Sequence, residues 1–383
     1  MSTNLPPLAL YLHLPWCVKK CPYCDFNSFT VGGTLPRQRY VEALIRDLDK
    51  EAERAAGRPL VSVFFGGGTP SLFPPDDIAR LLDVIYARFA AIADLEITLE
   101  ANPGTVESGA PAGYRRAGVN RLSLGAQSCD DAALAALGRI HRADDVRRSF
   151  AAARDAGFDN INLDLMYALP GQDPAGACAD LEAAFALGPE HLSWYHLTLE
   201  PNTVFYARPP VGLPDDDTAA EIQRRGESLL AERGYEQYET SAYARDRRYC
   251  RHNLNYWSFG DYLGIGAGAH GKLTNGEGVF RYAKPANPQS YMAAMESGAA
   301  PAPLRRVDAA DRSFEFMLNA LRLTGGFGAA QYTARTGLPA APLEIRLEAL
   351  MRRGLVEPAG IRRWRPTALG RRFLNELQAE FLP

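Results

Sequence analysis

Short β-rich runs alternate with longer amphipathic stretches along residues 8–200, and only a few fold types accept such a pattern. The intervening stretches, such as residues 36–55 and 75–90, repeat apolar residues at spacings of three and four, as one face of a helix does. Parallel strands joined by crossover helices close into a full or partial (β/α) barrel, or lie open as a doubly wound sheet. The runs that we predict to be strands are residues 8–14, 59–65, 95–101, 120–126, 160–168 and 191–199.

Polar and metal-binding residue types follow these predicted strands where each one ends. In both a barrel and an open sheet, the carboxyl ends of parallel strands form one rim, and ligands bind there. We therefore expect the side chains at the strand ends to meet at one site. In strand order they are Cys17, Cys21 and Cys24, then "GGGTP" (66–70), then Glu100 with "NPG", then Gln127, and Asp164 lies within the fifth strand.

The pattern changes after residues 208–217, "RPPVGLPDDD", which form a Pro-rich, acidic break. A chain of 383 residues accommodates roughly two or three domains. We assign residues 1–210 to the barrel and residues 211–304 to an α+β extension with a helix, a Tyr-rich strand and a Gly-rich run. Residues 305–383 read as helices, two short strands around a turn and a closing helix, which predicts a smaller winged-helix-like domain.

The composition, 46% hydrophobic and 23% charged residues, is that of an ordinary globular protein. A net charge of -3 argues against a nucleic-acid partner, and we interpret the basic stretch "RDRRYCRHN" as a solvated rim. No apolar stretch approaches the roughly 18 residues of a membrane span, and no signal peptide is evident, so we expect a cytoplasmic protein.

Three cysteines within eight positions suit a metal better than a disulfide, because one pair would leave a thiol over. A zinc site would need a fourth ligand, for which His13 is the nearest candidate. His13 lies in the alternating part of a predicted strand, where a structural histidine is the simpler interpretation. A four-iron cluster normally has four protein ligands, so three cysteines would leave one iron open to an exogenous ligand.

The spacing CxxxCxxC, with the aromatic Phe26 at the next position but one, resembles the radical S-adenosylmethionine (SAM) superfamily. The resemblance implies a [4Fe-4S] cluster on the three cysteines, whose open iron holds the amino and carboxylate groups of SAM. It also implies a SAM pocket with Tyr11 near the cluster. In that pocket Gly67, Gly68 and Thr69 line the methionine end, Glu100, Gln127 and Asp164 bond to the ribose or the amine, and Arg139 binds the carboxylate.

Six motifs along nearly the whole chain resemble the branch of oxygen-independent coproporphyrinogen III oxidase: "YLHLPWCVKKCPYCDFNS", "FFGGGTPS", "EANPGT", "RLSLGAQS", "LGRIHRADD" and "NLDLMYALPGQ". That oxidase extends its cysteine motif to CxxxCxxCxC, whereas Phe26 occupies the last position here. It also has a longer segment before the first strand. The CxxxCxxCxF form and "HNLNYW", residues 252–257, resemble instead the HemW heme chaperones of the same branch.

This second resemblance implies that His252 ligates heme iron and that Tyr256 and Trp257 offer flat faces to the porphyrin. Cys250 could be an alternative heme ligand, but a buried structural thiol is the simpler interpretation. We interpret Cys129 and Cys178 as structural.

The resemblance implies a heme chaperone that binds heme, carries a SAM-ligated cluster and passes heme to acceptors, in particular membrane-bound respiratory enzymes. It implies a homodimer when the cluster is bound, and a peripheral contact at the inner face of the membrane. One alternative is a radical SAM enzyme that decarboxylates coproporphyrinogen or opens heme reductively. Another is a nucleic-acid-modifying radical enzyme, which conflicts with the mildly acidic composition.

Overall fold

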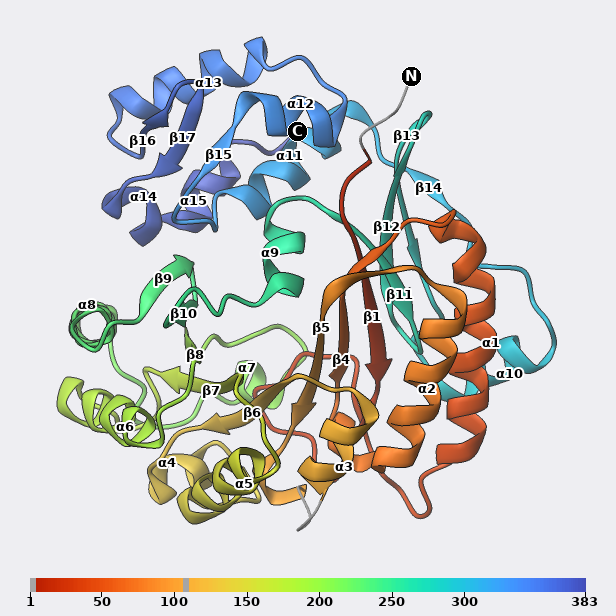
Figure 1. Ribbon diagram of the computed structural model, residues 1–383. Helices are drawn as coiled ribbons and strands as arrows, with labels where there is room; N and C mark the ends of the chain where they lie inside the picture. Colours follow the sequence, from red (N-terminus) through yellow and green to blue (C-terminus); the bar gives the residue numbers. More distant parts are fainter. Residues whose placement is uncertain (1–4, 106–109) are drawn as a thin grey trace.

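The structure, a computed structural model, describes residues 5–105 and 110–383. Within these residues, twelve strands form one strongly curved sheet in the order β14-β13-β12-β11-β1-β4-β5-β6-β7-β8-β10-β9 (Figure 1). The strands from β11 to β8 in this order run parallel, and the strands at both edges run antiparallel. The edge strands β9 and β14 do not pair with each other in the described chain, so the barrel is partial.

All six predicted strands are confirmed, each within a few residues of its expected bounds. They are β1 (Leu8–Leu14), β4 (Leu60–Gly67), β5 (Ala91–Ala101), β6 (Arg121–Gln127), β7 (Ile161–Tyr167) and β8 (His191–His196). Helices follow them on the outside of the sheet: α1 (Arg37–Ala55), α2 (Pro75–Arg88), α3 (Ala110–Ala117), α4 (Asp131–Ala136), α5 (Ala143–Asp155), α6 (Pro174–Leu187) and α8 (Asp216–Glu232). The predicted α/β fold, a partial (β/α) barrel, is therefore confirmed.

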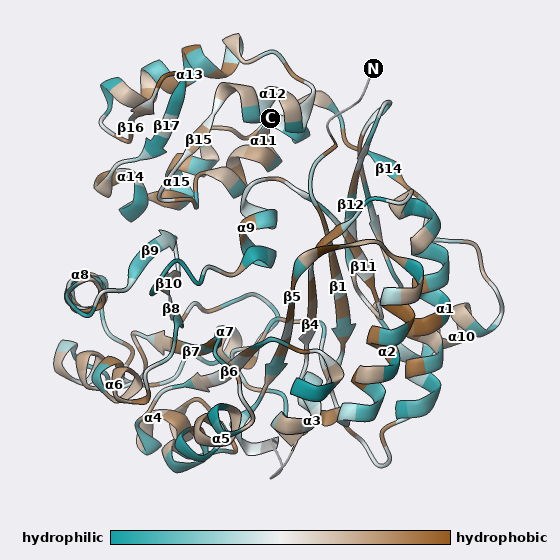
Figure 2. Cartoon of the chain, viewed as in Figure 1, coloured by the Kyte–Doolittle hydropathy of each residue, from teal (hydrophilic) through white to brown (hydrophobic). Residues whose placement is uncertain are grey.

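Local sequence explains where these helices begin and end. In α6, the Asp173 side chain accepts a hydrogen bond from the Gly176 backbone N–H, Pro174 fits the first turn, and Gly188 ends the helix at φ +71°. Each long helix turns an apolar stripe toward the sheet, and in α1 this stripe includes the fully buried Leu44 and Leu48. Figure 2 shows the corresponding brown colour along the central strands and teal on the outer faces of the helices.

The concave side of the sheet, in contrast, carries a column of buried polar side chains. The His191 ring is hydrogen-bonded to Asn162 Oδ1 at 2.6 Å, and Asn162 Nδ2 donates to Ser123 Oγ at 2.7 Å. Ser123 Oγ donates in turn to Asp164 Oδ2 at 3.0 Å. This interior therefore connects the amino ends of the strands to their carboxyl ends through polar groups.

Residues 211–304 add strands to both edges of the same sheet. The predicted single Tyr-rich strand over residues 235–243 is a hairpin, β9 (Glu236–Glu239) and β10 (Ala242–Ala244), because the chain turns at residues 240–241. The predicted Gly-rich run contains β11 (Asp261–Ile265), where a Cβ on Gly264 would lie 2.0 Å from the His270 carbonyl oxygen. The other elements are α9 (Arg251–Trp257), β12 (His270–Asn275), β13 (Gly278–Ala283) and α10 (Pro288–Glu296), and the edge strand β14 (Arg305–Arg306) follows just after this segment.

The C-terminal residues form a small winged-helix-like unit with its own core, as predicted. A three-stranded sheet in the order β15-β17-β16 packs with the helices around Phe316, Phe327 and Leu347. In Figure 1, α9 lies between this unit and the barrel. The elements are α11 (Ala309–Ala320), β15 (Phe327–Gly328), α12 (Ala329–Thr336), α13 (Ala341–Arg352), β16 (Val356–Gly360), β17 (Arg363–Pro366), α14 (Ala368–Arg372) and α15 (Leu374–Ala379). Every helix among the described residues is too short or too polar to cross a bilayer.

Candidate functional site

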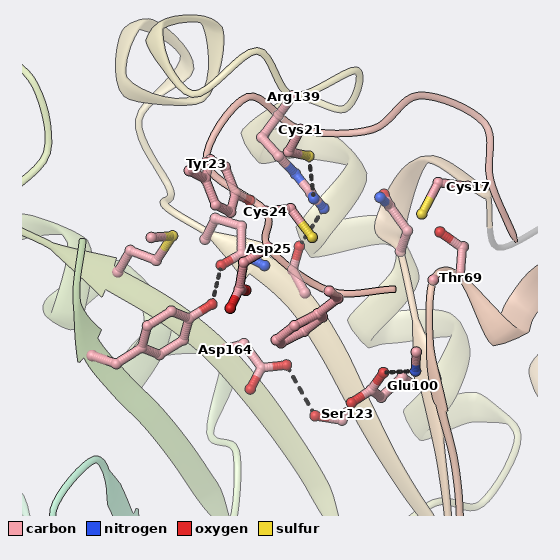
Figure 3. A pocket seen from close by; sticks show the side chains of 18 of the residues that line it. Cys17, Cys21, Tyr23, Cys24, Asp25, Thr69, Glu100, Ser123, Arg139 and Asp164 are labelled. Carbon is pink, nitrogen blue, oxygen red and sulfur yellow. Dashed lines mark hydrogen bonds between the residues drawn. The ribbon is translucent and has the colours of Figure 1, made fainter. Parts of the chain in front are cut away.

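A cavity of about 500 Å³ opens at the carboxyl ends of the parallel strands (Figure 3). Ten of the twelve predicted site residues line it, while Tyr11 and His252 do not. Residues far apart in the sequence therefore converge as expected from the ends of successive strands. The predicted residues that line the cavity are Cys17, Cys21, Cys24, Gly67, Gly68, Thr69, Glu100, Gln127, Arg139 and Asp164.

The three cysteines lie on a loop between two short strands, β2 (Trp16–Cys17) and β3 (Phe29–Thr30), which pair with each other. A turn closes where the Cys24 backbone N–H donates to the Cys21 carbonyl oxygen at 3.2 Å. Lys20 Nζ ties the loop by donating to the carbonyl oxygens of Phe26 and Ser28. No disulfide joins the cysteines in the described chain, and burial raises the pKa of the Cys17 and Cys24 thiols.

The zinc alternative finds no support in the geometry. Among residues 5–105 and 110–383, no three His, Cys, Asp or Glu side chains stand close enough together to hold one metal ion. Both ring nitrogens of His13 are already hydrogen-bonded, one to the Tyr11 hydroxyl at 3.0 Å and the other to the Asn27 carbonyl oxygen at 2.8 Å. His13 is therefore a structural histidine, as the strand pattern predicts, and Tyr11 orients it from the interior of the barrel.

The residues present fit a larger cluster with an open corner. Cys21 and Cys24 lie next to Arg139, and Cys17 lies next to Thr69, so the thiols border one space from different sides (Figure 3). Phe26 is 59% exposed and lines the same cavity without offering a ligand atom. Three thiolates would leave one iron of a four-iron cluster without a protein ligand.

Arg139 is positioned to bind an anionic group beside that corner. Its Nη1 donates to Cys21 Sγ at 3.3 Å, and its Nη2 donates to the Gly125 carbonyl oxygen at 2.8 Å. The Nε atom is buried and has no hydrogen-bond acceptor in the part of the chain that the structure describes. A free, buried N–H on a cation suits a ligand carboxylate.

The glycines of "GGGTP" form a wall that approaches the neighbouring chain closely. Gly67 has φ +115°, and a Cβ there would lie 2.6 Å from the His13 ring. A Cβ on Gly68 would lie 2.5 Å from the Trp16 carbonyl oxygen. Both glycines are thus required by packing alone, and their small size also leaves the backbone open to the cavity.

Two carboxyl groups at the floor of the cavity are hydrogen-bonded in a low-dielectric setting. Burial, reinforced by the nearby Asp164, raises the pKa of Glu100 to about 8. Burial also raises the pKa of Asp164, against the hydrogen bonds that it accepts from Ser123 and Asn162. Glu100 accepts a further bond from the Gly67 backbone N–H at 3.2 Å. Carboxyl groups in this setting can form hydrogen bonds with hydroxyl or amine groups of a ligand.

Gln127 completes this floor from a strained backbone position. It has φ +67°, an uncommon conformation for a residue other than glycine, and its Oε1 accepts a hydrogen bond from the Tyr195 hydroxyl at 2.7 Å. Tyr195 also lines the cavity and was not singled out from the sequence. Its place in an alternating strand, on the same face as Ser193 and His191, was the available signal.

His252 lies at the opposite end of the barrel, on α9, which covers the amino ends of the strands. It is 2% exposed, its Nδ1 is 2.9 Å from Ser62 Oγ, and its Nε2 is 3.2 Å from the Tyr256 hydroxyl. The ring stacks on Phe64 with 4.8 Å between centroids. Burial lowers the pKa of His252 to about 3, so the imidazole is neutral, the form that binds iron.

Glu96 fixes α9 in this position and was also missed from the sequence. Its carboxylate accepts hydrogen bonds from the backbone N–H groups of Arg251 and His252, each at 3.1 Å. Strand periodicity places Glu96 on the same face as Glu100, which was the available signal. Cys250 lies 3.8 Å from the same carboxylate, and burial raises the pKa of its thiol to about 12.

The basic stretch at residues 245–253 and the remaining cysteines have ordinary surroundings. Arg248 pairs with Asp159 at 3.3 Å, and Arg251 pairs with Asp94 at 2.6 Å, on an exposed rim. Cys129 is beside Asp180, which accepts a hydrogen bond from its backbone N–H at 2.7 Å. Both observations agree with the structural interpretation of these residues.

Comparison with known proteins relates the whole chain to one family. Residues 11–182 match the model of the radical SAM superfamily, and residues 307–373 match that of the HemN C-terminal domain. The fold resembles coproporphyrinogen III oxidase (HemN) from Escherichia coli, described as a radical SAM enzyme, with a TM-score of 0.82 and 24% identity over 98% of this chain and 90% of that one.

Two curated relatives are similar over nearly their full length. The heme chaperone HemW of Escherichia coli (strain K12) is 47% identical over 383 residues, and that of Haemophilus influenzae is 46% identical over 385 residues. In both cases 99% of each chain is covered. On this similarity, and with three cysteines and Phe26 around one cavity, the chain belongs to the HemW family of heme chaperones, within the radical SAM superfamily.

Proposed function

We propose that this protein binds heme and transfers it to acceptor proteins, and that it carries a SAM-ligated [4Fe-4S] cluster. The observation that carries the proposal is the 47% identity, over the full chain, with a protein named a heme chaperone. Membership of the radical SAM superfamily implies the cluster and SAM, and membership of the chaperone family implies heme as the cargo.

The cavity at the carboxyl ends of the strands is the proposed site of the cluster and SAM. Cys17, Cys21 and Cys24 would hold three irons, and Arg139 would pair with the SAM carboxylate through its free Nε–H. Glu100, Gln127 and Asp164 would accept hydrogen bonds from the amine and the ribose hydroxyls. A bound cluster supplies electron transfer to the ligand at its open iron.

His252 is the proposed axial ligand of heme. Its neutral imidazole is chemically suited to iron, but both nitrogens are bonded within the closed structure. Heme binding at this residue therefore requires α9 to move away from Ser62. The acceptors that we propose are membrane-bound respiratory proteins, reached by a cytoplasmic protein through a peripheral contact, and the cluster-bound form is proposed to be a dimer.

The test uses full-length protein purified without oxygen and with the cluster reconstituted. Heme is titrated into the wild type and the variant His252→Ala, and binding is followed by the Soret band. We expect one heme per chain in the wild type and loss of that binding in the variant. The matched control is His270→Ala, because His270 is an exposed histidine at the start of β12.

The same preparation separates the chaperone from a radical enzyme. The fold similarity to coproporphyrinogen III oxidase makes coproporphyrinogen the natural substrate to offer, together with a low-potential reductant and SAM. A chaperone would bind heme and leave the porphyrinogen unchanged. Conversion of the porphyrinogen with release of 5′-deoxyadenosine would contradict the proposal and favour the enzyme.

A further inference from the structure

Arg121 is a buried cation for which residues 5–105 and 110–383 provide no ion-pair partner. Its side chain is among the largest that are fully buried, with 2% exposure, at the first position of β6. No carboxylate oxygen of the described residues lies within 4.0 Å of its guanidinium, and its Nε has no hydrogen-bond acceptor. Burial of an unpaired guanidinium is energetically unfavourable, so an anion in this position would be strongly stabilised.

The carboxylates nearest to Arg121 are engaged elsewhere. Glu96 and Asp164 both act on the Arg121 charge through space and raise its pKa. Glu96 accepts from two backbone N–H groups of α9, and Asp164 accepts from Ser123 and Asn162. Neither can turn to the guanidinium without losing these bonds, so the fold maintains a free positive charge at this depth.

Other buried polar atoms without partners lie around the same helix. Thr98 is directly opposite Arg121 in the sheet register, and its Oγ1 has no partner among the residues with described positions. Trp257, in the "HNLNYW" motif, has an indole N–H that also lacks an acceptor in the described chain. Native structures contain few buried polar atoms without partners. Their presence both in the barrel interior and on α9, which covers it, indicates a ligand or an alternative arrangement there.

The helix α9, which covers the barrel interior at the amino ends of the strands, is short and is flanked by unusual backbone conformations. α9 has seven residues, and Glu96 of the barrel accepts hydrogen bonds from the first two backbone N–H groups of the helix. Asp246 and Arg247 before it, and Phe259 after it, have φ of +50°, +57° and +55°. Non-glycine residues with a left-handed backbone conformation are strained, and a segment can change direction at such positions.

We propose that Arg121 binds a propionate of heme when α9 moves outward and His252 ligates the iron. This inference rests on the proposed heme binding by His252, and it adds a second contact on the other side of the ligand. Glu96 accepts from the His252 backbone N–H, and Thr98, two residues further along the same face of β5, is opposite Arg121, so the two groups lie on the same side of the sheet. Phe64 and Tyr11, whose rings lie within 6.2 Å of the imidazole ring, supply flat apolar surfaces between them.

The ligand class follows from this combination. An iron ligand, two aromatic faces and one desolvated guanidinium match a metalloporphyrin that carries carboxylates. A guanidinium and a carboxylate form a charge-assisted, bidentate pair, which is the strong form of such a contact. The pair would also satisfy the Nε–H that the closed structure leaves free.

The test is a cycle of two ligands and two proteins. Heme and heme dimethyl ester, which lacks the propionate charges, are titrated into the wild type and Arg121→Gln, and the dissociation constants are measured from the Soret band. We expect the ester to bind the wild type at least about 10-fold more weakly than heme does, and Arg121→Gln to bind both ligands about equally. Equal losses for heme and ester in Arg121→Gln would overturn the inference, since they indicate a structural role only.

Two further variants protect the result. Arg121→Lys keeps the charge but not the bidentate geometry, so it should retain part of the preference for heme over the ester. This variant keeps the test usable if circular dichroism shows that Arg121→Gln does not fold. The absence of any preference in both the wild type and Arg121→Lys would overturn the inference. Arg248→Gln, on the exposed rim, should leave the preference unchanged. If the wild type binds neither ligand, the proposed function itself fails, whereas heme binding without a propionate preference overturns only the role of Arg121.

Discussion

The two ends of the barrel are built in opposite ways. At the carboxyl ends of the strands, thiols, a guanidinium and carboxyl groups border an open cavity of about 500 Å³. At the amino ends, α9 closes the barrel, and His252, the ligand-type side chain there, is 2% exposed with both nitrogens bonded. One end is ready for a ligand as it stands, and the other must open first.

This difference indicates how one fold can hold a resident cofactor and a transferable cargo. A preformed site retains a cofactor well, because little of the binding free energy is lost to ordering or opening the protein. A cargo has to leave, and a site that closes over its own ligand atoms after release favours departure. If heme binds His252 as proposed, only molecules with α9 open can bind it, and the apparent heme affinity would be reduced by the fraction of molecules that are open.

The largest effect that we expect from a substitution is at the open end of the barrel, where the cavity lies at the carboxyl ends of the strands. Replacement of Cys21 by Ala removes one of the three proposed cluster ligands and would leave two irons of a four-iron cluster without a protein ligand. We expect iron and sulfide per chain to fall to background in Cys21→Ala after anaerobic reconstitution. Cys178→Ala is the control, because this thiol lies on α6 outside the cavity, and it should keep wild-type iron. A Cys21→Ala protein with full iron content would show that another residue ligates the cluster.

The second effect concerns the closed end. Glu96→Gln weakens both hydrogen bonds that hold the start of α9, and it removes a negative charge that acts on Arg121 through space. We expect the free energy of unfolding in urea to fall by about 2 to 4 kcal/mol. If α9 covers the heme site, heme should also associate faster with this variant in stopped-flow measurements.

Asp94→Asn is the matched control for Glu96→Gln. It breaks the ion pair with Arg251 two residues earlier on the same strand, but both partners are exposed, so we expect a loss below about 1 kcal/mol. Unfolding free energies that match in the two variants would mean that the buried carboxylate does not hold α9.

Sequence periodicity located the open end well because its residues lie in or just after predicted strands. A polar residue inside a β-rich run marks the face of the strand that carries it, as Glu100 in β5 and Asp164 in β7 illustrate. The strand β11 was harder to foresee, since its pairing with β1 depends on a contact between residues about 250 positions apart. The Gly-rich run around this strand looks like a loop in sequence, but Gly264 within the strand is required for its close packing against His270.

The closed end could not be derived from residue patterns. "HNLNYW" has no polar or apolar period that assigns a face, so the burial of His252 follows only from the position of α9 over the barrel. The absence of a partner for Arg121 in the described chain is likewise a three-dimensional fact. A lone arginine at the start of a strand reads as a surface residue, which is the usual place for it.

A third effect, of intermediate size, is the contribution of the open end to the pH dependence of the free energy of unfolding. The pKa of Glu100 rises from 4.5 to about 8 in the folded protein through burial and the nearby Asp164. Between these values the folded state binds a proton that the unfolded state has lost, so the free energy of unfolding falls as pH rises through this window. In the cofactor-free protein, Glu100→Gln should remove about 2 kcal/mol of this fall between about pH 5 and pH 9, less than the full shift because the cavity is open to solvent.

Urea unfolding at the two pH values measures this difference. Glu182→Gln serves as the control, since its carboxylate forms an exposed pair with Arg233 and should leave the pH profile unchanged. A profile for Glu100→Gln that parallels the wild type would mean that Glu100 is ionised in the folded protein at neutral pH.

The smallest expected effect is the pH dependence of heme binding at the closed end. The pKa of His252 is lowered from 6.5 to about 3 by burial and by the Arg121 charge, so the imidazole carries no proton that iron must displace. Heme affinity should therefore change by less than about twofold between about pH 5 and pH 8, as measured by Soret titration. An exposed histidine would instead lose about tenfold in affinity for each pH unit below its ordinary pKa. Such a loss would mean that α9 is already open in solution, and the contrast between the two ends would then disappear.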